Sequence, residues 1–278
     1  MNIYQAIWDA DMRGNGIRPI LPNEKGDISQ GFVVVDMESG NSQHFILRDI
    51  HIPDKKRSSY LLFEKLLDNF SLNQTSKEKN TESEANEIED FLSMAISSPP
   101  MVIAKKFIEE NNQIELTPSE WYTYLYELWF RQFDWESGKD LSGFEHVFIG
   151  EQKGRKLVGH HFWYKYWLEV SNVIHHKDQL DISCANQQEQ NPVAPIVVTI
   201  SFHLKAYDFA KRRFIKIFKK KCAFFVGLSP EGLLAMGTVR AMPNAPVNSL
   251  INGVTYTLEL IKSPDGKSIR TFYPVFAT

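Results

Sequence analysis

Residues 142–158 read Ser-Gly-Phe-Glu-His-Val-Phe-Ile-Gly-Glu-Gln-Lys-Gly-Arg-Lys-Leu-Val, and this stretch predicts a β-hairpin. Its first part, 144–150, is a short apolar run typical of a buried strand, and a turn at 152–155 precedes the return at 156–158. A helical pattern follows from about His161. Strands that pair through a turn and are then followed by a helix indicate an α+β fold with antiparallel sheets.

The rest of the C-terminal half has the same order of elements. Ser229-Pro230-Glu231 places a capping Ser before a Pro at the first helical position, and Ser263-Pro264-Asp265-Gly266 predicts the turn of a final hairpin. No strand–helix–strand alternation is present, which supports the α+β class. The extended segments expected here are 196–202, parts of 213–226, 255–261 and 269–276.

The N-terminal part is mainly helical by its pattern, with a polar loop at 71–90. Thr117-Pro118-Ser119-Glu120 forms a capping box and marks the start of the next unit. We therefore divide the chain into an N-terminal, mainly helical region, 1–112, and a two-lobed region of antiparallel sheets with packed helices, 113–278. The polar stretch 185–195 is the expected linker between the lobes, which cover 113–188 and 189–278.

Composition excludes several classes of protein. The chain has 278 residues with 31 Lys and Arg against 34 Asp and Glu, and its net charge of −3 excludes a globally basic nucleic-acid binder. Its cysteines, Cys184 and Cys222, are too few for a disulfide scaffold or a four-cysteine zinc site. No apolar run approaches the roughly 20 residues of a membrane span, and the N-terminus has no leader pattern. We expect a monomeric, cytoplasmic protein; a secreted protein with its leader removed has the same pattern.

Eight histidines are the first candidates for chemistry, because imidazole titrates near neutral pH. His44, His51 and His203 stand alone and are expected to be structural or exposed. The adjacent His175 and His176 would point about 100° apart on a helix, so they make a poor metal pair.

His146 and the pair His160-His161 have a different context. Burying an unpaired imidazole in the apolar run 144–150 costs free energy, so we expect His146 to have a hydrogen-bond partner. Because a hairpin returns the chain on itself, His146 and His161 can line one cleft. No Cys or His lies beside them at the spacing of zinc ligands, which argues against a zinc site.

A local basic patch covers residues 211–221, which contain seven cations and no acid. Phe214, Phe218, Phe224 and Phe225 interleave with it or follow it. The simplest interpretation is a solvated strand face. The alternative is that alternate lysines point to opposite faces of a strand, so that some face a cleft and suit a phosphodiester ligand.

Two imidazoles and a lysine together suit the cleavage of RNA by its own 2′-hydroxyl. One imidazole takes the proton of that hydroxyl and the other protonates the departing 5′-oxygen, and each proton transfer contributes about 10²–10⁴-fold. A fixed lysine stabilises the charge of the five-coordinate phosphorane. The core step of this chemistry needs no metal.

The motifs that carry these groups resemble those of the EndoU (XendoU) family of uridylate-preferring endoribonucleases. The run 142–151 resembles the signature around the first histidine of the family, and Gly159-His160-His161-Phe162-Trp163 matches its Gly-x-His-x-Trp stretch. The family lysine precedes a stretch that is matched by residues 225–231, and an ungapped count places it at Lys219. Residues 271–273 match the C-terminal Thr-x-Tyr.

This resemblance implies an α+β fold with two lobes around a cleft, and a role for each matching residue. His161 would be the general base on the 2′-hydroxyl and His146 the general acid on the leaving oxygen, while Lys219 would stabilise the phosphorane. Tyr273 would stack on or orient the uridine, with Thr271 nearby. The products would be a 2′,3′-cyclic phosphate and a 5′-hydroxyl.

The resemblance also implies activation by a metal, since family members commonly require or are stimulated by Mn²⁺ or Ca²⁺. The two glutamates that flank the first histidine, here Glu145 and Glu151, are associated with activity in the family. On a regular strand they share one face and His146 lies on the other. We therefore expect them to order the backbone or to hold an ion at a distance rather than beside His146.

Three positions depart from or complicate the family pattern. Ala223 stands where many members have a serine that contacts the uracil, so its backbone N–H is left as the donor and the uridine preference is expected to be weaker. His160 replaces an apolar residue, which leaves open that it takes part in binding substrate. The run Lys219-Lys220-Lys221 makes the choice of lysine depend on the ungapped count.

The expected function is cleavage of single-stranded RNA at uridylates. The alternative is a non-cleaving RNA- or phospholipid-binding protein with the same basic cleft. A pure binder does not need two imidazoles around a phosphate, and this favours the enzyme.

Overall fold

The computed structural model describes residues 2–36, 46–78, 80–171, 179–189, 196–208 and 212–277. Helices dominate the N-terminal part, and they are interspersed with strands from residue 133 onward. The helical elements are α1 (Ile3–Arg13), α2 (Asp54–Lys65), the 3₁₀ turn η1 (Leu66–Asp68), α3 (Glu82–Ile96), α4 (Pro99–Asn112), α5 (Pro118–Trp129), the π-helical turn η2 (Glu145–Ile149), α6 (Trp163–Val170) and α7 (Pro230–Arg240).

The strands form four small sheets. A three-stranded sheet has the order β1-β2-β3, a two-stranded sheet pairs β4 with β5, a five-stranded sheet has the order β6-β7-β10-β9-β8, and a last sheet has the order β11-β12-β13. The strands are β1 (Arg18–Ile20), β2 (Phe32–Val35), β3 (Leu47–His51), β4 (Phe133–Trp135), β5 (Gly138–Leu141), β6 (Glu151–Lys153), β7 (Lys156–Val158), β8 (Gln179–Glu189), β9 (Val197–Asp208), β10 (Arg213–Phe225), β11 (Asn248–Ile251), β12 (Val254–Lys262) and β13 (Ile269–Phe276).

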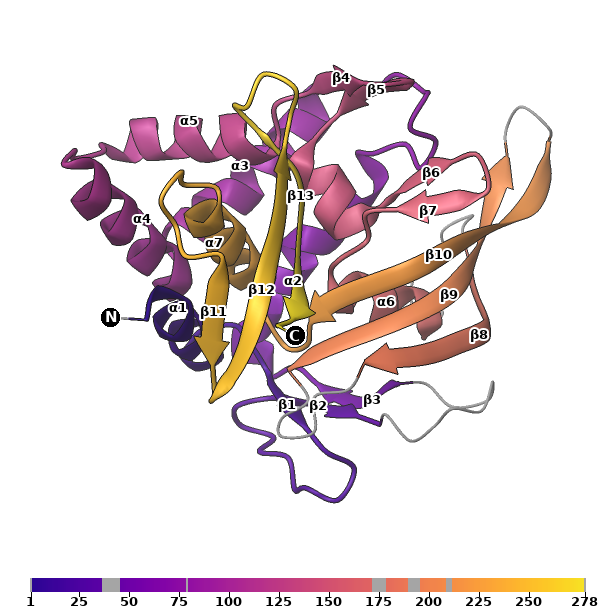
Figure 1. Cartoon of the computed structure of the whole chain (residues 1–278), viewed down its shortest axis with the longest axis horizontal. Coiled ribbons are helices and arrows are strands. Elements are labelled where there is room, and N and C mark those ends of the chain that lie inside the picture. Colours follow the sequence, from indigo (N-terminus) through magenta and orange to yellow (C-terminus); the bar gives the residue numbers. More distant parts are fainter. Residues whose placement is uncertain are drawn as a thin grey trace.

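The elements are arranged in two unequal parts with a sheet between them (Figure 1). Helices α1, α3, α4, α5 and α7 lie on one side, and the five-stranded sheet projects on the other. The β11–β13 sheet lies between them, since β12 contacts α7 and β13 contacts β10. The site described below lies where β13, η2 and β10 approach one another.

Aromatic side chains hold these parts together. Phe144 is completely buried, stacks on Phe130 and Phe148 with ring centroids 4.5 Å apart in each case, and meets Phe91 from α3 edge-on at 5.5 Å. Rings in such a cluster contribute about 0.5–1.5 kcal/mol per pair beyond their burial. The segment that leads into η2 is therefore anchored in the core of the molecule.

The α+β class is confirmed, together with the capping box at Thr117 and the final hairpin of β12 and β13. Two expectations are wrong in detail. Residues 145–149 form a π-helical turn and not a strand, so the predicted hairpin is reduced to β6 and β7. The β1–β2 and β7–β10 pairs are parallel, because segments distant in the sequence, and not hairpins, bring them together.

The expected linker is also partly a strand. Residues 185–189 belong to β8, and residues 190–195 lie outside the described part of the chain. The proposed lobe boundary at 188/189 falls inside β8, and strands from both sides of it share the five-stranded sheet. None of the described helices is both long and apolar enough to cross a membrane.

Candidate active site

The π-helical turn η2 begins with a reciprocal pair of hydrogen bonds. The backbone N–H of Glu145 donates to Ser142 Oγ at 3.1 Å, and the backbone N–H of Ser142 donates to Glu145 Oε2 at 3.4 Å. This Ser-x-x-Glu arrangement satisfies two backbone donors at a helix start, as in a capping box. Turns of this wide kind are frequent at functional sites, and this one carries His146.

Gly150 ends the turn and redirects the chain. Its φ of +89° lies in the region that favours glycine, and a Cβ there would lie 2.8 Å from the Cβ of His160. The redirected chain places Glu151 next to His146, with Oε1 3.2 Å from His146 Nδ1. The expectation that Glu151 lies on the face opposite His146 is therefore wrong, because the intervening residues are not a strand.

Arg270 on β13 completes this group. Its guanidinium donates to both oxygens of Glu151, over 2.5 and 2.6 Å, in a bidentate ion pair. Burial alone would raise the pKa of Glu151, but the hydrogen bonds from Arg270 and the nearby His146 lower it below the ordinary 4.5. Glu151 is consequently an ionised, fully buried carboxylate that faces an imidazole.

The segment 159–161 is fixed against η2 by the backbone. The N–H of His160 donates to His146 O at 2.8 Å, and the N–H of His161 donates to Val147 O at 2.6 Å. This approach requires glycine at position 159, where φ is +68° and a Cβ would lie 1.9 Å from His146 O. Two backbone hydrogen bonds and one glycine thus bring the two motif histidines together.

The rings of His146 and His161 lie in one pocket with their centroids 6.4 Å apart. His161 Nδ1 lies 2.9 Å from Ala223 O on β10, and its ring stacks on Tyr273 with a centroid distance of 4.5 Å and an interplanar angle of 13°. Because a carbonyl oxygen can only accept, Nδ1 of His161 carries the proton and Nε2 carries the lone pair.

The pocket has a volume of about 530 Å³, and η2, β7, β10 and β13 contribute to its walls. Lys219 lines it and is buried, and its Nζ donates to Gly159 O. Burial lowers the pKa of this lysine, while Cys222 and Glu151 oppose the shift. The full lining is His146, Lys156, Leu157, Val158, Gly159, His161, Phe218, Lys219, Lys220, Lys221, Ala223, Thr271 and Tyr273.

The two histidines have different electrostatic surroundings. Burial lowers the pKa of His146 to about 4, although the Glu151 carboxylate opposes this shift. Burial and the positive charge of Lys219 hold the pKa of His161 well below 6.5, and only a backbone carbonyl opposes them. Of the two, only His146 faces a carboxylate, which stabilises an added proton. Ala223 O fixes the tautomer of His161, and burial and Lys219 favour the neutral form of that ring.

Six of the candidate residues line this pocket, and Glu151 lies beside one of them, His146; the six are His146, His161, Lys219, Ala223, Thr271 and Tyr273. His160 is completely buried and points away from it, with Nε2 2.6 Å from Glu169 Oε2 on α6. Its neighbour Lys165 is bonded to the same carboxylate. The ring of His160 is held against α6, outside the lining of the pocket. Glu145, the first residue of η2, is buried and does not line the pocket either.

Of the other histidines that the structure describes, neither lines the pocket: His51 stacks on Phe32, and His203 packs at a tilt against Phe218. His44, His175 and His176 lie outside the described residues. Arg270 is the member of the site that sequence reasoning missed; the available signal was a lone cation next to Thr271 in an otherwise apolar strand.

The described residues do not assemble a group of three or more carboxylate, imidazole or thiolate ligands suited to a metal ion. Glu151 is occupied by Arg270 and His146. Glu145 keeps one buried oxygen, Oε1, that makes no hydrogen bond within the described chain, and burial raises its pKa well above 4.5. Burial disfavours the ionised form of Glu145 that a metal requires, so these residues as placed do not fit a metal site.

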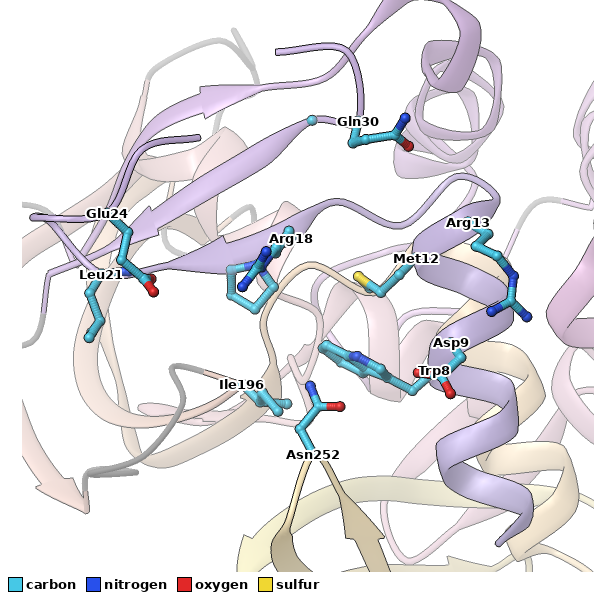
Figure 2. Close-up of a pocket in the computed structure, with 12 residues that line it drawn as sticks. Trp8, Asp9, Met12, Arg13, Arg18, Leu21, Glu24, Gln30, Ile196 and Asn252 are labelled. Atoms are coloured by element: carbon cyan, nitrogen blue, oxygen red, sulfur yellow. The ribbon is translucent and has the colours of Figure 1, made fainter. Parts of the chain in front are cut away.

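A second hollow of about 470 Å³ lies between α1, β1 and the turn that joins β11 to β12 (Figure 2). Trp8, Met12 and Pro19 contribute its apolar surface, and Arg13 and Arg18 are exposed at its rim. The described residues that line it include no histidine and no buried charged group.

The pocket is basic and holds a buried amine and two imidazoles, one beside a carboxylate and one beside a backbone carbonyl. On an α+β fold, these groups define a site for general acid–base cleavage of a phosphodiester. Residues 2–274 match the model of the family described as Endoribonuclease XendoU, and the chain belongs to this family. The resemblance stated from the motifs is thereby confirmed.

The relatives found by sequence cover nearly the whole chain. A protein of Danio rerio named "Uridylate-specific endoribonuclease C" is 28% identical over 98% of this chain and 86% of its own length. A protein of Xenopus laevis named "Poly(U)-specific endoribonuclease-A" is 27% identical over 98% of this chain and 92% of its own. A solved structure of XendoU, titled a splicing-independent snoRNA processing endoribonuclease, has a TM-score of 0.68 and 20% identity, and covers 99% of this chain and 96% of that one. This structural likeness shows the fold.

Proposed function

We propose that this protein is an EndoU-type endoribonuclease that cleaves single-stranded RNA at uridylates. The observation that carries the proposal is the unequal pair of imidazoles in one pocket, one backed by the ionised Glu151 and the other by Ala223 O. Membership of the XendoU family and the names of the relatives support the same activity.

We assign the two proton transfers on the basis of the hydrogen bonds that the imidazoles make. His161 is the general base, because its Nδ1–H is held by a carbonyl and its Nε2 lone pair is left to take the 2′-hydroxyl proton. His146 is the general acid, because the Glu151 carboxylate stabilises its imidazolium form. The 2′-oxygen then attacks phosphorus, the bond to the 5′-oxygen breaks, and that oxygen takes the proton of His146.

Lys219 supplies the electrostatic part of the reaction. Its ammonium group is buried at the pocket wall, where a charge acts more strongly than in water. The non-bridging oxygens carry more negative charge in the phosphorane than in the ground-state phosphodiester. A fixed ammonium group therefore lowers the barrier more than it tightens binding.

We assign the uridine to the wall of the pocket that β13 contributes. Tyr273 is already stacked on His161, and Thr271 has a buried Oγ1 that makes no hydrogen bond within the described residues. A buried hydroxyl without a partner is costly unless a ligand satisfies it. Thr271 and the N–H of Ala223 are the groups we assign to the uracil edge, and the absence of a hydroxyl at Ala223 weakens the preference.

Activation by Mn²⁺ or Ca²⁺ is a separate part of the proposal, and it rests on the family resemblance alone. No step above passes through a metal, because the glutamates nearest to the pocket do not form a ligand group. We place any metal effect outside the proton transfers.

The test uses a fluorescent oligonucleotide of adenosines with a single uridine. Cleavage 3′ of the uridine with a 2′,3′-cyclic phosphate end is expected, and 2′-deoxyuridine at that position should prevent it. The assay is run with EDTA and with Mn²⁺, so that a requirement for metal is separated from inactivity. Binding without cleavage under both conditions would establish the alternative, a non-cleaving RNA-binding protein.

A further inference from the structure

One face of β10 outside the pocket carries alternating aromatic and basic side chains. Phe214 and Phe218 are 48% and 38% exposed, which is unusual for phenylalanine on a sheet. Lys216 and Lys220 occupy the alternate positions and are also exposed. Because residues two apart on a strand share a face, these four side chains form one row.

The neighbouring strand β9 extends this row into a surface. His203 pairs with Phe218 in the register and packs against it, with ring centroids 4.8 Å apart and the rings tilted by 34°. Lys205 pairs with Lys216 and places its Nζ 4.9 Å from the centre of the Phe214 ring. We call the surface formed by His203, Lys205, Phe214, Lys216, Phe218 and Lys220 the β10 platform.

The β10 platform is continuous with the pocket. Phe218 and Lys220 line the pocket, and Lys156 of β7, which pairs with Phe218, lines it too. From Phe218 the platform runs four residues further along β10 to Phe214, which is about 13 Å at the usual rise of a strand. Strands β9 and β10 project from the body of the molecule along this path (Figure 1).

The chemistry of this surface fits single-stranded nucleic acid. Flat rings accept stacked bases of any sequence, and lysines between the rings contact the phosphates that join those bases. A protein partner of ordinary apolar character would not favour four basic or imidazole groups among two phenylalanines. The patch is also local, since the chain as a whole has a net charge of −3.

We propose that the β10 platform binds the nucleotides on the 3′ side of the scissile bond, with bases stacked on Phe218 and Phe214. The inference rests on the proposed function, and it extends that function to the length of RNA that the enzyme engages. The binding mode is independent of sequence beyond the uridine.

We infer the direction of the bound RNA from the elements that line the pocket. The uridine lies against Tyr273 and Thr271 of β13 and carries the 2′-hydroxyl that His161 deprotonates. The next nucleotide lies beyond the phosphate and carries the leaving oxygen. Phe218 of β10 and Lys156 of β7 also line the pocket, and Phe218 continues into the platform, so we assign the 3′ nucleotides to their side.

The experiment measures binding with uncleavable probes. A fluorescent oligonucleotide with one 2′-deoxyuridine is extended by adenosines on its 3′ side or on its 5′ side, and Kd is measured by anisotropy. The 3′ extension is expected to tighten binding to the unaltered protein, and Phe214→Ala to remove about 5- to 20-fold of that gain. Lys220→Gln should reduce the slope of log Kd against log salt by about 0.7.

Leu250→Ala is the matched control, because Leu250 is 50% exposed on β11, outside the platform and the pocket. It should keep the full gain from the 3′ extension. An equal gain in Phe214→Ala and the unaltered protein, with folding verified by thermal melting, would overturn the proposal, and so would a gain from the 5′ extension alone. Because these probes cannot be cleaved, failure of the proposed function appears separately, as intact all-ribose oligonucleotides of every length.

Discussion

Two hollows among the described residues are of similar size, about 530 and 470 Å³, and they differ in what their walls contain. The pocket at β10 and β13 holds buried ionisable groups, namely His146, His161 and Lys219. The hollow beside α1 has its charges, such as Arg13 and Arg18, exposed at the rim.

The comparison shows that the volume of a hollow does not identify the active site. The presence of buried ionisable groups, whose burial costs free energy, does identify it. Burying an imidazole or an ammonium group is unfavourable unless partners hold it. In the β10 pocket each such group has a partner: Glu151 for His146, Ala223 O for His161 and Gly159 O for Lys219. The described lining of the hollow beside α1 includes no buried charged group, so we assign no reaction to it.

The largest effect is expected from the two imidazoles. His161→Ala and His146→Ala should each lower kcat/KM on a uridine-containing oligonucleotide by about 10²–10⁴-fold, because each removes one proton transfer. His51→Ala is the control, since this imidazole stacks on Phe32 away from the pocket. Turnover of His161→Ala at the rate of the unaltered protein would refute the assignment.

Removal of the lysine should have the next largest effect. Lys219→Ala is expected to lower kcat by about 10²-fold and to change the Kd of an uncleavable substrate much less, because the ammonium group acts on charge that develops in the transition state. Lys220→Ala, its exposed neighbour, should change kcat far less. If the two variants lost kcat equally, the choice of Lys219 would be wrong.

A smaller effect is expected in the pH profile. Activity needs His146 protonated. Without RNA, burial holds the pKa of His146 at about 4, and the phosphate anion of bound RNA raises it, so kcat falls as pH rises through the pKa of His146 in that complex. Glu151 raises that pKa, whereas Arg270 and Lys219 lower it. Glu151→Gln should therefore move the alkaline limb of the profile to lower pH, and Arg270→Ala should move it to higher pH. Shifts of the same sign in both variants would contradict the electrostatic account of His146.

The smallest effect is expected at the second hollow. Arg18→Ala should change kcat/KM by less than about twofold, as is usual for an exposed side chain away from the chemistry. The measurement is the same cleavage assay, with thermal melting as a check on folding. A loss as large as that of Lys219→Ala would mean that both hollows serve the reaction, and the distinction between them would fail.

Much of the fold could be predicted from local sequence chemistry. Thr117 and Ser229 begin helices where their capping patterns indicated, and the Pro264-Asp265-Gly266 turn joins the last two strands. These features depend on residues a few positions apart. The parallel pairing of β7 with β10 does not, since Lys156 and Phe218 are distant in the sequence and nothing local specifies the match.

The sequence allowed the residues of the site to be predicted, but not how they are arranged in space. The motifs identified His146, His161 and Lys219, but a short apolar run such as 144–150 does not distinguish a strand from a helical turn. The overlooked signal was Ser142-Gly-Phe-Glu145, a Ser-x-x-Glu spacing that starts η2. With η2 read as a strand, Glu151 was assigned to the wrong side of His146, and the role of Arg270 could not be inferred.

The division of labour between the imidazoles is tested most directly by a substrate whose bridging 5′-oxygen is replaced by sulfur. A thiolate leaves without a proton, so the general acid becomes unnecessary while the general base is still required. His146→Ala should cleave this substrate nearly as fast as the unaltered protein, and His161→Ala should remain inactive. Rescue of His161→Ala instead of His146→Ala would contradict the assignment of base and acid.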